Sequence, residues 1–390
     1  MAPQSPPGHS GTTVPAPFAE PKTPSPNSPD ITRSIWPRLL AALLFFGSLE
    51  ALLFHSGLYA SLINPESGAG WVGSLLRNEI RRAKPDRNQV LAVGNSRMAL
   101  LPRVANEMKG QTDYTFGSIV LGGTSPRGWY YELRGVDPTA RAYAAIVIPS
   151  DDYDELDRFE DLADHETDPY YLVNLLQLGD LLDFPRSYRD NKLKWRATES
   201  ILLKGLIYQR DILDFLANPA GRLAQVRLFR QGTAEWVYGY KGEPASLRGL
   251  TIDWDHKIAH FPDGLTPYTR GLINDSLFTP LPPDRGRQTT YFRYWFSRIV
   301  DRYRDSGTKI IFLRVPRAPV FLPYHSPKRD SSIRQLASRP NVIVLDEHLF
   351  DELERPEFFI DAIHLNGDGM VKFSRILAIE VRNHLGAPQS

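Results

Sequence analysis

A serine, a histidine and an aspartate, which together can perform acyl transfer, occur where turns are expected. Ser96 follows the apolar run at residues 89–94 within "AVGNSRMALLP", and Asp361 and His364 lie three residues apart in "FFIDAIHLNGDGM". A serine hydroxyl is a weak nucleophile that needs an adjacent base, and the base needs an acceptor on its other ring nitrogen. His364 could serve as that base and Asp361 as its acceptor.

Each of these residues also has a simpler interpretation. Ser96 alone would more often cap a helix than act as a nucleophile. Asp361 alone would be a solvated loop acid, and His364 a surface histidine with satisfied hydrogen bonds. Their joint placement after the predicted strands favours a Ser-His-Asp site.

Five short apolar runs must position these residues. They are rich in Val and Ile and lack strict alternation, as strands buried on both faces of a parallel sheet do. Helical patterns lie between them, including one that begins at Ser125 as N-cap and Pro126. We therefore expect an α/β domain with three layers and about five parallel strands, formed by residues 89–94, 114–122, 142–149, 309–316 and 341–346.

In such a sheet, ligands bind beyond the carboxyl ends of the strands. The backbone N–H of Ser96 and that of a glycine after the second run could stabilise a developing oxyanion. Arg97, Arg314 and Arg317 could bind an anionic group, although structural ion pairs are the favoured interpretation. The candidate oxyanion and substrate-binding residues are Gly122, Gly123, Ser150, Asp151, Arg97 and Arg314.

Two blocks resemble a known family. Gly94-Asn95-Ser96 resembles the Gly-Asp-Ser block of the SGNH (GDSL-like) hydrolases, and "DAIHLNGDGMVKFS" resembles their closing Asp-x-x-His block. The resemblance implies a flavodoxin-like α/β/α fold, with Ser96 as nucleophile, His364 as base and Asp361 as its partner. It also implies that Gly122 or Gly123 is the oxyanion glycine.

Two positions depart from the family pattern. Asn95 stands where the family usually has Asp, and the third block reads "PSDDYD" where an Asn normally donates to the oxyanion. An ionised aspartate cannot donate a hydrogen bond. Ser150 or a backbone N–H must then substitute for the Asn, or the oxyanion hole is weaker by about 10²–10³ in turnover.

An apolar segment near the N-terminus predicts a membrane anchor. Residues 38–63 are nearly continuously apolar, and about 20 such residues span a bilayer as a helix. Trp36 and Tyr59 are expected to lie at the membrane interfaces. Glu50 would face a partner helix or be protonated, because a carboxylate within the membrane is costly. A buried helix of a soluble domain is the alternative.

The remaining segments are assigned from composition and periodicity. The Pro-rich tail 1–34 is expected to be disordered, and 64–87 to be a linker. Residues 88–153 and 288–390 would form the SGNH-like domain, interrupted by a mostly helical insertion or cap at 154–287, in which "DWDHKIAH" has no recognisable metal spacing.

Charge and cysteine content bear on which ligands and which kinds of site the chain can have. The net charge is +1 and the chain has no cysteine. No nucleic-acid footprint is therefore visible, and disulfides and thiolate metal sites are excluded. No metal or other cofactor is expected.

The family resemblance and the layout together suggest envelope polysaccharide O-acylation. They imply a single-pass membrane protein whose SGNH-type esterase or O-acyltransferase domain is extracytoplasmic. Its substrate would be an acylated carbohydrate or another ester, and its partner a membrane-bound O-acyltransferase. The alternative is a catalytically weak scaffold, or a polysaccharide-binding partner of that acyltransferase, in which Trp195, Trp236 and Trp254 could stack on sugars.

Overall fold

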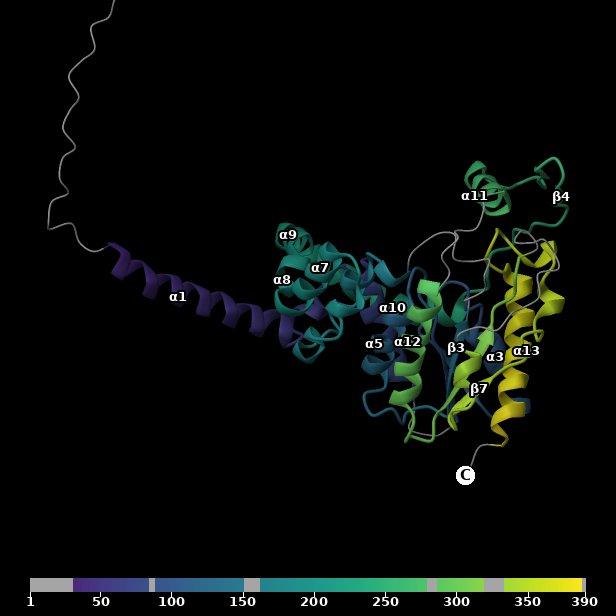
Figure 1. Ribbon diagram of the computed structural model, residues 1–390, viewed down its shortest axis with the longest axis horizontal. Helices are drawn as coiled ribbons and strands as arrows, with labels where there is room; N and C mark the ends of the chain where they lie inside the picture. Colours follow the sequence, from purple (N-terminus) through teal and green to yellow (C-terminus); the bar gives the residue numbers. More distant parts are fainter. Residues whose placement is uncertain (1–30, 84–87, 151–161, 279–285, 319–332, 388–390) are drawn as a thin grey trace, which may run out of the picture. The chain divides into compact units, whose positions relative to one another are not determined.

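The computed structural model describes residues 31–83, 88–150, 162–278, 286–318 and 333–387. The chain divides into two compact units, Met1–Leu49 and Glu50–Ser390. Helix α1 (Ile31–Glu50, Figure 1) occupies the described part of the first unit. It begins within the predicted tail 1–34, whose residues 1–30 lie outside the described part. Residues Ile35–His55 form a helix long and apolar enough to cross a membrane, as predicted.

The predicted end of the span at residue 63 is wrong. After the π-helical turn η1 (Ala51–His55), Gly57 adopts φ 81°, and the helical rod ends there. Tyr59 is buried rather than interfacial, and its hydroxyl donates to Asp211 Oδ2 at 2.7 Å. The apolar run therefore has two parts. Its first part forms the helix that is long enough to cross a membrane, and its last residues belong to the core of the second unit.

Glu50 has partners within its own chain, contrary to the expectation of a partner helix. Its side chain is buried, and the backbone N–H of Gly205 donates to Oε1 at 3.0 Å. His55 Nε2 lies 4.0 Å from the same oxygen. Nearby, burial lowers the pKa of Lys204 to about 8, and its ammonium donates to the Leu176 carbonyl. A carboxylate in an apolar segment is thus accommodated by the fold.

The centre of the second unit is a sheet of five parallel strands in the order β2-β1-β3-β6-β7. Each predicted run overlaps one of them, and only β3 extends beyond its run, by one residue, so the expected α/β sheet is confirmed. The strands are β1 (Gln89–Ala92), β2 (Thr115–Ser118), β3 (Ala145–Ser150), β6 (Lys309–Arg314) and β7 (Val342–Val344).

Residues of the central strands alternate between two hydrophobic cores. Val90 and Ala92 of β1 belong to one core, whereas Leu91 and Val93 belong to the other. This double burial explains why the sequence shows no polar alternation. Figure 1 shows the sheet between two helical layers. The first core holds α3 (Pro102–Glu107) and α13 (Gly367–Leu385), and the second α2 (Gly68–Arg82), α5 (Pro126–Val136) and α12 (Gly286–Arg302).

Two sequence assignments change at this level. Residues 64–87 are not merely a linker, because α2 buries Val72 and Leu76 in the second core. Ser125 stands at the N-cap of α5, with Pro126 as first helical residue, but its side chain caps no backbone N–H. Its hydroxyl has a different partner, described below.

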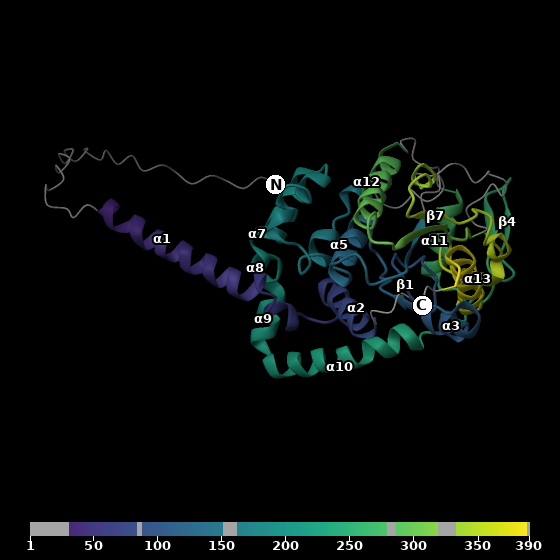
Figure 2. The same cartoon turned by 90° about the horizontal axis from the view of Figure 1, so that it is seen from below.

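The insertion is largely helical, as expected, but it also contains a small antiparallel pair, β4 (Thr251–Asp253) and β5 (Ile258–His260). These two strands and the turn between them include all of "DWDHKIAH". Figure 2 shows α10 (Pro219–Gly239) running from α9 (Gln209–Ala217) past α2 toward α3. The other α-helices described in this region are α6 (Asp168–Tyr171), α7 (Asn191–Leu202), α8 (Lys204–Ile207) and α11 (Pro267–Phe278).

Candidate active site

Ser96 lies in a tight turn directly beyond the carboxyl end of β1. The backbone N–H of Met98 donates to the Asn95 carbonyl at 3.0 Å, and the Asn95 side chain accepts from the Arg97 N–H at 3.0 Å. Helix α3 begins only at Pro102. The interpretation of Ser96 as a helix N-cap is therefore wrong, and its exposed side chain projects from a turn.

Gly94 allows this turn to form. A Cβ at this position would lie 2.6 Å from Pro149 Cγ and 2.9 Å from Met98 Cβ. The Gly94 carbonyl also accepts a hydrogen bond from the Leu121 N–H at 3.1 Å. The close approach of the ends of β1 and β3 thus requires glycine immediately before Asn95-Ser96.

The structure brings the three predicted catalytic side chains, Ser96, His364 and Asp361, into one chain of hydrogen bonds, which we call the relay. Ser96 Oγ lies 2.7 Å from His364 Nε2, and His364 Nδ1 lies 2.8 Å from Asp361 Oδ2. The serine and the aspartate therefore contact opposite nitrogens of the same ring. This is the geometry in which the imidazole can take the serine proton while the carboxylate stabilises the imidazolium that forms.

Asp361 is held as an ionised acceptor. Burial would raise its pKa, but hydrogen bonds from the His364 side chain and from two backbone amides outweigh that effect and lower the pKa below its ordinary value. Its second oxygen, Oδ1, accepts from the N–H groups of Ile363 at 2.9 Å and His364 at 2.8 Å. The carboxylate consequently fixes both the loop and the ring.

Asn366 anchors the same loop at the start of α13. Its side-chain oxygen accepts from the Gly369 N–H at 2.9 Å, and its amide nitrogen donates to the Glu357 carbonyl at 2.7 Å. Phe359 and Leu365 form a backbone bridge across the loop. The Asn that follows the histidine therefore serves as a helix cap that positions His364.

Gly122 is the glycine that lies close to the nucleophile. A Cβ on Gly122 would be 3.6 Å from Ser96 Cβ, and both residues line one pocket. Gly123 adopts φ +72°, the left-handed region that glycine enters without strain. Ser150 ends β3, fully buried and in register with Arg314, and the predicted Asp151 lies outside the described residues.

The arginines near this edge are engaged with the protein itself. Arg97 is buried and donates to the Pro316 carbonyl at 3.4 Å. Arg314 is also buried and lies 3.9 Å from Glu347, and Arg317 lies 3.5 Å from Glu354. The contacts of Arg314 and Arg317 agree with the structural ion-pair interpretation, whereas the contact of Arg97 is with a backbone carbonyl. The assignment of Arg97 and Arg314 to substrate binding stays a prediction.

A pocket of about 360 Å³ opens beside the relay. Ser96, His364 and Gly122 belong to its lining, and most of the other lining residues are apolar. One wall comes from the C-terminal end of α10, through Trp236 and Val237, and from its C-cap residue Tyr240. Residues 236, 237 and 240 share one face of a helix, but no sequence pattern relates that face to a serine 140 positions earlier. The sequence predicted only that the insertion could form a cap.

The three insertion tryptophans differ in environment. Trp195 is 65% exposed, and Trp254 packs against the first core. Trp236 is half-exposed and its ring lies 5.1 Å from that of Trp71 of α2. Only Trp236 therefore belongs to the pocket beside Ser96 among the tryptophans described.

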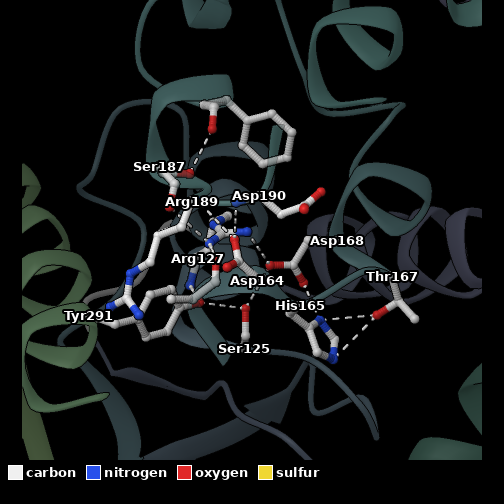
Figure 3. A network of polar contacts seen from close by, with 12 residues as sticks. Ser125, Arg127, Asp164, His165, Thr167, Asp168, Ser187, Arg189, Asp190 and Tyr291 are labelled. Carbon is white, nitrogen blue, oxygen red and sulfur yellow. Dashed lines mark hydrogen bonds and ion pairs between the residues drawn. The ribbon is translucent and has the colours of Figure 1, made fainter. Parts of the chain in front are cut away.

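A second set of serine, aspartate and histidine lies at the start of α5 (Figure 3). Ser125 Oγ donates to Asp168 Oδ2 at 2.9 Å, and His165 Nδ1 lies 2.8 Å from Asp168 Oδ1. The guanidinium of Arg127 lies 3.3 Å from the same carboxylate, and the Tyr291 hydroxyl donates to Ser125 Oγ. The aspartate is in the middle of this cluster, and all of these side chains are buried.

Residues that could hold a metal do not gather in the described part of the chain, where no group of three or more His, Asp or Glu side chains is suitably placed. In the "DWDHKIAH" segment, His256 Nδ1 pairs only locally with Asp253 Oδ2 at 2.7 Å, on the surface.

A comparison with known proteins gives no family for this chain: no family model matches it, and no curated protein matches it in sequence. Its chemistry must therefore be argued from the residues at the carboxyl edge of the sheet.

Proposed function

We propose that this protein is a membrane-anchored serine esterase or O-acyltransferase of the SGNH type. The observation that carries the proposal is the relay of 2.7 Å from Ser96 to His364 and 2.8 Å from His364 to Asp361. The strand order, which is 2-1-3-4-5 when the five parallel strands are counted along the chain, is that of flavodoxin-like folds and adds support.

The first half-reaction forms an acyl-enzyme. Ser96 Oγ bonds to the ester carbonyl carbon while its proton passes to His364 Nε2. The carbonyl oxygen becomes an oxyanion, for which the N–H groups of Ser96 and Gly122 are the proposed donors. The tetrahedral intermediate then breaks its bond to the leaving alkoxide, which takes the proton from His364.

The second half-reaction returns the serine. Water or a sugar hydroxyl gives its proton to His364 and bonds to the acyl carbon. The bond between that carbon and Ser96 Oγ breaks, and the serine recovers the proton from His364. Water as acceptor makes the protein an esterase, and a sugar hydroxyl makes it a transferase.

The proposed location follows from the anchor. A helix at Ile35–His55 would fix the domain to a membrane, and we place the domain on the extracytoplasmic side. Acylated carbohydrate of the cell envelope is the proposed substrate, and a membrane-bound O-acyltransferase the proposed partner.

The test is covalent labelling of the full chain in lipid nanodiscs. After incubation with a small alkyl fluorophosphonate, intact mass should increase by one phosphonyl adduct. Ser96→Ala should abolish the adduct, because the hydroxyl that attacks phosphorus is gone. Ser125→Ala is the matched control, since it removes a serine from the buried cluster and should leave labelling in place.

The outcomes separate the interpretations. A Ser96-dependent adduct would establish an activated nucleophile, and sugar acceptors added to an acylated enzyme would then distinguish transfer from hydrolysis. No adduct on folded protein would contradict the proposal and favour a non-catalytic scaffold.

A further inference from the structure

The pocket beside Ser96 has walls that suit hydrocarbon. Among the described residues that line it, none carries a carboxylate, an ammonium or a guanidinium group. Its polar side chains are Ser96 and His364 of the relay, Ser118, Trp236 of α10 and the C-cap residue Tyr240. The apolar part of the lining includes Met98, Leu100, Val120, Val237, Leu365 and Met370.

The size of the pocket exceeds what an acetyl group needs. A volume of about 360 Å³ corresponds to roughly a dozen groups of the size of a water molecule, at about 30 Å³ each. An acetyl group would fill only a small part of it. Binding pockets of this volume usually enclose most of the surface of their ligand, so a longer occupant is expected.

The wall on α10 is held firmly in place. Trp71 of α2 packs against Phe229 with ring centroids 4.6 Å apart and against Trp236 at 5.1 Å. Beyond the C-terminal end of α10, the Glu243 carbonyl accepts from the Gly367 N–H at 2.7 Å, at the start of α13. The insertion thus meets the loop of His364 directly, and Val237 is buried in the wall between.

We infer that this pocket binds the acyl chain of the substrate, and that α10 selects linear chains of roughly six to ten carbons. The inference rests on the proposed function, because only a nucleophilic Ser96 makes the occupant an acyl group. A sugar would have to lie on the other side of the relay, since the apolar walls leave most of its hydroxyls unpaired.

The experiment measures kcat/KM for p-nitrophenyl esters from acetate to dodecanoate, with the full chain in nanodiscs and Ser96→Ala as background. Each buried methylene should raise kcat/KM roughly fourfold until the pocket is full, near eight carbons. Val237→Phe should lower the ratio of octanoate to acetate kcat/KM by about tenfold or more, because the ring occupies the pocket.

Two further variants serve as controls. They separate the filling of the pocket from misfolding of the protein and from partition of the esters into the lipid. Glu235→Phe adds the same ring to an exposed position of α10 and should keep the wild-type ratio. Val237→Ala enlarges the pocket and should shift the preferred chain to one or two carbons longer.

The failure of this inference can be distinguished from the failure of the proposed function. A fluorophosphonate adduct at Ser96 together with a flat chain-length profile would overturn the acyl-chain pocket and leave the serine hydrolase intact. An unchanged octanoate-to-acetate ratio in Val237→Phe would overturn the role of α10. Absence of the adduct would remove the nucleophile on which both depend.

Discussion

Two clusters built from serine, histidine and aspartate lie in the described part of the molecule, and they differ in order and in burial. In the first, His364 lies between Ser96 and Asp361, and Ser96 is exposed. In the second, Asp168 lies between Ser125 and His165 and is nearly inaccessible to solvent. A base must touch the hydroxyl to activate it, so the order alone suits the first cluster to chemistry and the second to structure.

The surroundings strengthen this difference. The first cluster opens into an apolar pocket of about 360 Å³. The second is sealed around the guanidinium of Arg127, which lies 3.7 Å from the centre of the Tyr188 ring. Burial alone would lower the pKa of Arg127, but Tyr291, Tyr188 and Asp168 outweigh it and raise that pKa above its ordinary value. The guanidinium of Arg127 is buried and paired with Asp168, so we assign this cluster a structural role.

The largest expected effect is on Asp361. Asp361→Asn removes the acceptor that fixes the tautomer and the orientation of the His364 ring, and should lower the rate of fluorophosphonate labelling by roughly 10⁴-fold. The melting temperature should change little, because asparagine keeps a side-chain oxygen that can accept the hydrogen bonds from the Ile363 and His364 N–H groups. Labelling kinetics followed by intact mass would measure this, and a loss of less than about tenfold would contradict the assigned role.

Asp168 should show the opposite pattern. Asp168→Ala leaves Arg127 buried without its carboxylate, and we expect the free energy of unfolding to fall by roughly 3–5 kcal/mol. Urea titration monitored by tryptophan fluorescence would measure it, with Asp361→Ala as the matched control. Folded Asp168→Ala protein should label at the wild-type rate, and slow labelling of that folded fraction would break the distinction between the clusters.

Glu132 of α5 should make the unfolding free energy depend on pH, and we expect this effect to be smaller than that of Asp168→Ala. Its carboxyl group is buried, neither oxygen has a hydrogen-bond partner among the described residues, and burial followed by the charge of Asp168 raises its pKa from 4.5 to about 8. A carboxyl whose pKa is higher in the folded state stabilises the fold most below its unfolded value, and that stability is lost as pH rises toward 8.

Glu132→Gln removes this titration. Between pH 5 and pH 8, the unfolding free energy of the wild type should fall by roughly 3 kcal/mol more than that of the variant. Urea titrations of both proteins at the two pH values would measure these changes in unfolding free energy. The contributions of the other titrating groups are the same in both proteins and cancel when the two changes are subtracted. Parallel pH profiles would show that Glu132 is ionised in the folded protein.

Parts of the site could be read from the sequence because they are local. Asp361 and His364 lie within one loop, so their spacing alone places a carboxylate beside a ring. Ser96 follows an apolar run whose Val and Ile residues indicate a buried strand, and the helix after Ser125 begins at Pro126 as predicted. Short-range geometry and hydrophobic periodicity carry this information.

Other parts required the folded chain. Tyr59 looks like a membrane-interface residue until Asp211, 152 residues away, accepts its hydroxyl hydrogen bond. Similarly, the sequence alone suggests a second protein as the partner of Glu50, whereas the fold brings the Gly205 N–H to its carboxyl group. Both partners lie in the insertion, whose docking depends on packing rather than on any local pattern.

The sequence by itself determined the five buried strands, the apolar helix near the N-terminus and the residues of the relay, because each depends on neighbours within a few positions. Only the tertiary structure decided that Ser96 meets His364 across 268 residues, that Ser125 bonds to Asp168, and that α10 forms a wall of the pocket. Such contacts depend on which faces of distant elements pack together, and hydrophobic patterning specifies that a face is buried without specifying its partner.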